Sequence, residues 1–140
     1  MDRRTFIAHT TCALAAAAGG CASLVTVPVV PEGGVIRLTP ASHPSLSRPG
    51  GWLKVLPASW SSPLYVLALE DGSYAAVSPI CTHLGCTVDI SGLRLVCPCH
   101  GSTYDREGNV LRGPAERALQ RFPTQVTGAG EIIVAIGGMQ

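Results

Sequence analysis

Charge is scarce in this 140-residue sequence, and neither sign is in clear excess. Charged residues make up 14% of the chain, and the formal net charge at pH 7 is +1. The sequence has no basic patch that points to nucleic acid as a partner. The length fits one ordinary domain and excludes a multidomain protein. Because 46% of the residues are hydrophobic, the chain can bury a core, which excludes disorder for most of it.

The first part of the chain has even less charge than the average. Residues 5–31 carry no formal charge, and Arg3 and Arg4 are the only basic residues before them. The paired arginines, the bulky Phe6 and Ile7 after them and the small-residue run that follows resemble a bacterial twin-arginine export signal. We therefore expect an exported protein on the periplasmic side of the bacterial inner membrane.

Three fates are open for this leader, residues 1–21. A helix over residues 6–30 is long enough to cross about 30 Å of hydrocarbon and to remain as an anchor. The run that ends at Cys21 resembles a lipoprotein cleavage site, in which that cysteine carries the lipid. Cleavage after Ala18 would instead release a soluble protein. We favour a membrane anchor, by lipid or by helix, over release.

Beyond the leader the sequence shows no internal repeat, and residues 25–51 show no sustained helical period. Residues 22–50 are rich in proline and glycine, which predicts a tether that ends in an edge strand at 35–38. In residues 51–140, short apolar runs separated by turn residues predict strands. These runs are 52–56, 64–69, 74–77, 93–97, 108–111, 122–126 and 132–136. Short strands at this density predict an all-β sandwich or barrel, with one possible helical turn near residues 115–119.

Two segments rich in cysteine and histidine carry the chemistry of the chain. Residues 81–86 read Cys-Thr-His-Leu-Gly-Cys, and residues 97–102 read Cys-Pro-Cys-His-Gly-Ser. The linking residues 87–96 are long enough to form a hairpin that brings both segments to one end of the domain. Two soft thiolates and two imidazoles can then converge on a single metal centre.

This pattern resembles the Rieske iron-sulfur family, in which two histidines replace two cysteines on one iron of a 2Fe-2S cluster. The resemblance covers about 60 residues between positions 52 and 124, and the two segments are its most specific part. It implies that Cys81 and Cys97 hold one iron of the cluster. It implies that His83 and His100 hold the other iron.

The resemblance extends beyond these four ligands. It implies a disulfide between Cys86 and Cys99 that joins the two cluster loops. Ser102 and Tyr104 match hydroxyl positions that, in high-potential members, donate hydrogen bonds to a bridging sulfide and to a ligand cysteine. Residues 113–115 resemble the proline loop that covers the cluster. The implied fold is a Rieske-type antiparallel β-sandwich or barrel over residues 51–140, with the cluster-binding part, about 79–115, at one tip.

Two other interpretations of the same residues are weaker. A closed Cys2His2 zinc site would use the same four ligands, but it explains neither the extra cysteine in each segment nor the residues after the second one. A purely structural disulfide scaffold would leave His83 and His100 without a role.

The resemblance implies one-electron transfer by a high-potential cluster, as a subunit of an oxidoreductase complex rather than as a stand-alone enzyme. The expected context is a membrane quinol-oxidising cytochrome bc-type complex, respiratory or photosynthetic, with cytochrome b and a c-type cytochrome as partners. There His83 and His100 would be the proton-coupled contact with quinol. One alternative is the electron-relay subunit of a molybdenum oxidoreductase such as arsenite oxidase, with a molybdopterin subunit as partner. The other is a non-redox, metal-stabilised lipoprotein that acts as a binding module.

Overall fold

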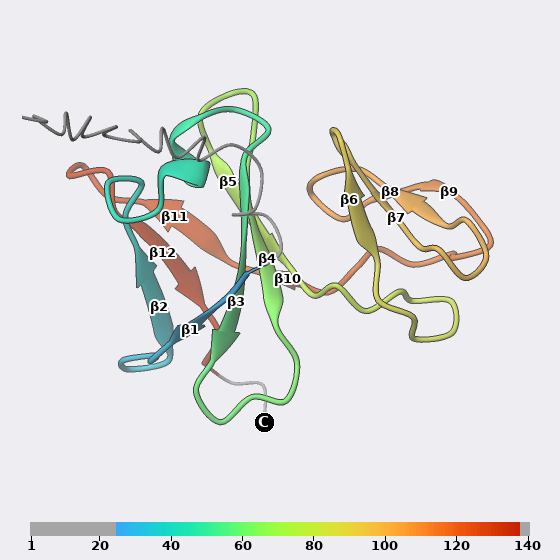
Figure 1. Cartoon of the computed structure of the whole chain (residues 1–140), viewed down its shortest axis with the longest axis horizontal. Coiled ribbons are helices and arrows are strands. Elements are labelled where there is room, and N and C mark those ends of the chain that lie inside the picture. The colour runs from blue at the N-terminus through green and yellow to red at the C-terminus, as the bar shows by residue number, and fades with distance from the viewer. Residues whose placement is uncertain (1–24, 138–140) are drawn as a thin grey trace, which may run out of the picture.

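The computed structural model describes residues 25–137 of the chain (Figure 1). The expected leader, residues 1–21 with Cys21, lies outside the described residues. Within residues 25–137 the chain forms three β-sheets and one short 3-10 helix, η2 (Pro44–Ser47). The expectation of an all-β fold is therefore confirmed for this part of the chain.

Two of the sheets pack face to face and form what we call the base of the molecule (Figure 1). The larger sheet contains, in spatial order, β1 (Thr26–Val29), β3 (Trp52–Pro57), β4 (Leu64–Ala68), β5 (Tyr74–Val77) and β10 (Arg121–Phe122). β1 runs parallel to β3, and the other neighbours are antiparallel. The smaller sheet is antiparallel and contains, in spatial order, β11 (Thr124–Val126), β12 (Ile132–Ala135) and β2 (Val35–Leu38).

The third sheet projects to the side of the base in Figure 1. Its four antiparallel strands are β6 (Asp89–Ser91), β7 (Arg94–Val96), β8 (Thr103–Tyr104) and β9 (Val110–Arg112). We call this sheet and its loops, residues 79–119, the small lobe. Both cysteine- and histidine-rich segments lie in it, at the end of the β6–β7 hairpin opposite its turn.

β4 joins the two parts because both of its faces are covered. All five of its residues are buried, and successive side chains of a strand point to opposite faces of the sheet. Leu64 and Val66 pack into the core of the base, with residues of β2 and β12. Tyr65 and Leu67 pack into a second core, shared with residues of the small lobe such as Val88. The strand is therefore continuously apolar instead of alternating, and it fixes the small lobe against the base.

The structure corrects the expected pattern between residues 115 and 126. The single strand predicted at 122–126 is two strands in different sheets, because Pro123 has no N–H to continue the pairing with β5. The helical turn predicted near residues 115–119 is wrong. That segment is irregular, with Ala115 and Leu119 buried in the core of the small lobe. Burial of these two side chains decides its conformation, rather than local helix propensity.

The structure also differs from the expected tether at residues 22–50. The strand at 35–38 is present, but residues 26–29 form a further strand, β1, whose proline is tolerated because the strand lies at a sheet edge. Leu46 is fully buried in the base. Gly51 allows the close approach of this stretch to β3, because a Cβ there would lie 1.7 Å from the Ser45 carbonyl oxygen. The described part of the stretch is thus part of the folded domain.

Membrane spanning can be assessed only where the structure is described. Between residues 25 and 137 it contains no helix long and apolar enough to cross a membrane.

Arg106 makes a second connection between the small lobe and the base. Its side chain is buried, and its two terminal nitrogens donate to the carbonyls of Gly92 in the β6–β7 turn, at 2.9 Å, and Gly51 at the start of β3, at 2.6 Å. Burial lowers the pKa of this guanidinium. In the sequence Arg106 stands in a turn-like run, so only the fold identifies it as an internal cross-link.

Tyr65 adds a hydrogen bond across the same boundary, and this bond can be tested. Its hydroxyl donates to the Val88 carbonyl of the small lobe at 2.9 Å. We predict that Tyr65→Phe lowers the free energy of unfolding by about 1 kcal/mol and speeds hydrogen exchange in β7 and β8. The matched control is Tyr74→Phe, which loses a similar bond to the Leu46 carbonyl but within the base. Equal exchange in the small lobe for both variants would contradict the predicted coupling.

Candidate metal centre

The two cysteine- and histidine-rich segments form loops with the same backbone hydrogen bonds. In the first loop the Cys81 amide donates to the Cys86 carbonyl at 2.7 Å, and the Gly85 amide donates to the Cys81 carbonyl at 3.0 Å. The second loop repeats both bonds, Cys97 to Ser102 at 2.8 Å and Gly101 to Cys97 at 2.9 Å. Each loop thus folds tightly around its first cysteine.

A glycine closes each loop, four residues after that cysteine. Gly85 has φ +82° and Gly101 has φ +79°, which is the left-handed region that side chains with a Cβ rarely adopt. The shared Cys-x-x-x-Gly spacing is therefore a geometric requirement of both loops. This spacing is visible in the sequence, and it could have predicted that the two loops are alike.

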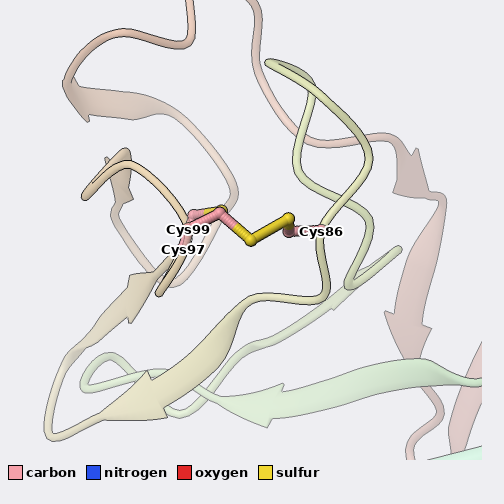
Figure 2. A group of neighbouring side chains, drawn as sticks. All are labelled: Cys86, Cys97 and Cys99. Atoms are coloured by element: carbon pink, nitrogen blue, oxygen red, sulfur yellow. A yellow bond between two sulfur atoms is a disulfide. The ribbon is translucent and has the colours of Figure 1, made fainter.

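The disulfide that the resemblance implies is present in the structure. Cys86 and Cys99 are bonded and connect the two loops (Figure 2). Figure 2 also shows Cys97 beside this bond, and the sulfur atoms of the three residues lie within 4.8 Å of one another. Because two of these sulfurs are bonded to each other, only Cys97 in this group can supply a thiolate to a metal.

Among the described residues, Cys81 and Cys97 are the free cysteines, and both are buried with exposures of 2%. Burial opposes ionisation of Cys81, but hydrogen bonds from Tyr104 and from the His83 backbone outweigh it, so the pKa of this thiol is lowered. Burial and the neighbouring Cys81 raise the pKa of Cys97. The two thiols are close enough to influence each other, as two ligands of one metal centre must be.

The two histidines meet at the outer side of the loops. The ring centroids of His83 and His100 are 4.9 Å apart, and the rings are perpendicular. His100 is exposed and His83 is half-buried. The Nδ1 atom of His83 is buried, yet it has no hydrogen-bond partner. A buried nitrogen without a partner is costly unless it has a ligand, so this atom fits a bond to a metal.

Two buried hydroxyl groups, those of Tyr104 and Ser102, lie close to the two loops. The Tyr104 hydroxyl is 3.3 Å from the sulfur of Cys81. Burial raises the pKa of Tyr104, and Cys81 raises it further. The Ser102 hydroxyl is fully buried and accepts a hydrogen bond from the Ala115 amide at 3.0 Å, which leaves its own proton free to be donated.

The donor set fits an iron-sulfur cluster with two sulfur and two nitrogen ligands. The fold brings together two buried thiols, a pair of histidine rings and a disulfide between the loops that carry them. Tyr104 lies against Cys81, as the resemblance implies. The sequence pattern assigns no role to Thr82, but its hydroxyl lies within hydrogen-bond distance of both the Tyr104 hydroxyl and the Arg117 carbonyl.

Comparisons with known proteins agree with this site. The family described as "Rieske [2Fe-2S] domain" matches residues 54–123, which is half of the chain. The fold and the two loops thus define an iron-sulfur protein of the Rieske class. The chain belongs to the Rieske [2Fe-2S] domain family, and its cofactor is a 2Fe-2S cluster.

Curated relatives carry names from one kind of complex. The cytochrome b6-f complex iron-sulfur subunit 2 of Nostoc sp. (strain PCC 7120) is 36% identical over 104 residues, which cover 68% of this chain and 58% of that protein. The cytochrome b6-f complex iron-sulfur subunit of Synechococcus elongatus is 45% identical over 69 residues, which cover 46% of this chain and 38% of that protein. The matches therefore span about half of each relative or less.

A solved structure supports the fold. The complex of reduced oxygenase and oxidized ferredoxin in carbazole 1,9a-dioxygenase matches with a TM-score of 0.57 at 23% sequence identity. The match covers 74% of this chain and 94% of that chain. At this identity the likeness shows the shared fold and nothing about the partner or substrate.

The disulfide leads to a test of stability. Cys86 and Cys99 are 13 residues apart, and a cross-link over such a loop stabilises a protein by about 3 kcal/mol. We predict that the double variant Cys86→Ser/Cys99→Ser loses this amount, measured by chemical denaturation, and releases its cluster at lower temperature, measured by visible absorbance. Each single variant should lose as much, because either one removes the cross-link. A double variant as stable as the original protein would contradict this role.

Proposed function

We propose that the chain is a high-potential one-electron carrier and serves as the iron-sulfur subunit of a quinol-oxidising cytochrome bc-type complex. The observation that carries this proposal is the asymmetry of the site. Its two thiols are buried, while its two histidine rings reach the outer side of the loops. A carrier needs such an arrangement, because a donor or acceptor must approach one side of the centre while the other side is held by the protein.

In this proposal the two cysteines and the two histidines have different roles. Cys81 and Cys97 would hold one iron of the cluster, and His83 and His100 would hold the other. When bound, the cluster supplies a centre that accepts and returns one electron, and its two neutral nitrogen ligands raise the potential above that of a four-cysteine cluster. The outer nitrogen of each imidazole would face a reacting quinol, and a ring that has lost its outer proton could accept the proton of the quinol together with the electron.

The hydroxyls of Ser102 and Tyr104 tune this centre. Both are buried, so the hydrogen bonds that they donate to sulfur are not exchanged for bonds to water. A donated proton stabilises negative charge on sulfur, and the reduced state carries more of that charge. Both side chains therefore raise the reduction potential.

The tip also offers an apolar contact beside the histidines. Leu84 follows His83 directly, and its side chain is 69% exposed. An exposed leucine next to the electron-accepting rings suits a quinol or the apolar rim of its binding site in a cytochrome. The names of the curated relatives favour a cytochrome complex over a molybdopterin subunit as the partner.

Membrane association follows from the same proposal. The relatives in Nostoc and Synechococcus are named as subunits of the cytochrome b6-f complex, which supports a membrane location for this chain too. The proposal also includes export by the twin-arginine-like leader 1–21 to the periplasmic side. It further includes anchoring through Cys21 or an uncleaved helix. The leader 1–21 and Cys21 lie outside the described residues, whereas residues 26–29 of the expected helix over 6–30 form strand β1 instead.

The ligand assignment can be tested one residue at a time. We predict that replacing any one of the four ligands with alanine abolishes the electron paramagnetic resonance signal of the reduced Rieske cluster; the four are Cys81, His83, Cys97 and His100. The matched control is Ser102→Ala on the same loops. This variant should keep the signal. Its midpoint potential should fall by tens of millivolts, which corresponds to the free energy of about one hydrogen bond. Persistence of the full signal in a ligand variant would exclude that residue as a ligand.

The role in a complex can be tested on native membranes. Purification through this chain should recover a b-type and a c-type cytochrome, and Leu84→Asp should slow quinol-driven reduction of the c-type cytochrome. Leu93→Asp is the matched control, because Leu93 is also exposed (51%) but lies in the turn at the opposite end of the β6–β7 hairpin. Recovery of a molybdopterin subunit instead, or equal effects of both variants, would contradict the proposal.

A further inference from the structure

Thr82 lies in the first ligand loop, between Tyr104 and the segment that follows β9. Its hydroxyl oxygen is 2.6 Å from the Arg117 carbonyl oxygen and 3.1 Å from the Tyr104 hydroxyl oxygen. Its backbone amide donates to the same Tyr104 oxygen at 3.2 Å. The Tyr104 oxygen is in turn 3.3 Å from the sulfur of Cys81. The phenol therefore has three neighbours within hydrogen-bond distance, and two of them belong to Thr82.

Counting protons determines the direction of these bonds. The Arg117 carbonyl can only accept, so the single hydroxyl proton of Thr82 is committed to it. Toward Tyr104 the Thr82 oxygen can then offer only a lone pair, so Tyr104 must be the donor in that contact. Tyr104 has one proton and two acceptors within reach, the Cys81 sulfur and the Thr82 oxygen.

We infer that Thr82 is a positioning residue that competes with Cys81 for the Tyr104 proton and thereby lowers the reduction potential of the centre. A proton shared with Thr82 is donated less fully to the Cys81 sulfur, so the negative charge of the reduced state is stabilised less. The inference rests on the proposed one-electron function, and it concerns how the chain sets the potential of that same site.

The two parts of Thr82 act in opposite directions. Its amide donates to the phenol oxygen, which polarises the O–H bond and strengthens donation by Tyr104. Its hydroxyl draws that donation away from Cys81. A side-chain substitution removes only the second effect, because the amide belongs to the backbone.

Thr82 also has a structural role that must be separated from the competition. Its bond to the Arg117 carbonyl ties the first ligand loop to the loop after β9. Loss of this tie can change the potential by altering the packing around the loops, whether or not Tyr104 has a proton to donate. A single variant therefore cannot distinguish the two roles, but a double-mutant cycle with Tyr104 can.

The experiment measures midpoint potentials by protein-film voltammetry in four proteins: unsubstituted, Thr82→Val, Tyr104→Phe and the double variant. Competition predicts that Thr82→Val shifts the potential more positively when Tyr104 is present than in the Tyr104→Phe background. Thr82→Ser keeps a hydroxyl at this position and is the matched control, expected to stay close to the original potential. Thr82→Ala provides the same cycle if the valine variant does not fold.

The outcomes separate this inference from the proposed function. Equal shifts of Thr82→Val in both backgrounds, or a smaller shift when Tyr104 is present, would overturn the competition and leave Thr82 with the structural tie alone. Absence of a one-electron wave in the unsubstituted protein would instead contradict the proposed function. A second readout is the Fe–S stretching band in resonance Raman spectra, which should change with Thr82→Val only in proteins that retain Tyr104.

Discussion

The Cys86–Cys99 disulfide is the constraint on which the rest of the site depends. Each ligand loop is short, lies at the surface of the small lobe and takes its shape from its own backbone bonds and glycine, with side-chain bonds such as that of Thr82 to the Arg117 carbonyl in addition. The covalent link holds the two loops at a fixed separation before any metal is bound. It thereby offsets part of the entropy cost of bringing four ligands from two segments to one point.

The asymmetry of the site follows from the way the small lobe is attached to the base. β4 is covered on both faces, so Tyr65 and Leu67 provide a rigid apolar floor under the lobe. Cys81 and Cys97 belong to the same buried core and are therefore shielded from water. The histidines lie on the side away from this floor, where a partner has access. The same packing thus shields the two cysteines from water and leaves the two histidines accessible to a partner.

Much of this organisation could be predicted from the sequence. The strands at 35–38 and 74–77 have the predicted bounds, because their apolar runs end at clear turn residues. The two cysteine- and histidine-rich segments led to the cofactor and the disulfide through their resemblance to the Rieske family, and both are confirmed. The four ligands remain a prediction, which the geometry of the site supports.

The features that were missed depend on contacts between distant segments. β1 was hidden in a stretch rich in proline and glycine, and only its pairing with β3 makes it a strand. Arg106 stands among turn residues, so its neighbours in the chain do not indicate that its side chain connects the small lobe to the base. The role of Thr82 depends on the approach of the Arg117 carbonyl, 35 residues away. In each case tertiary packing decides the role of the residue, and local sequence does not report it.

The central claim is that a 2Fe-2S cluster is held by two cysteines and two histidines at the tip of the small lobe. Pulsed electron paramagnetic resonance of the reduced protein, labelled with ¹⁵N-histidine, tests this claim most directly. The account predicts strong coupling to two histidine nitrogens in the unsubstituted protein, and loss of the whole signal when either His83 or His100 is replaced. A paramagnetic cluster without histidine coupling, or a protein that binds only zinc and gives no signal, would contradict it.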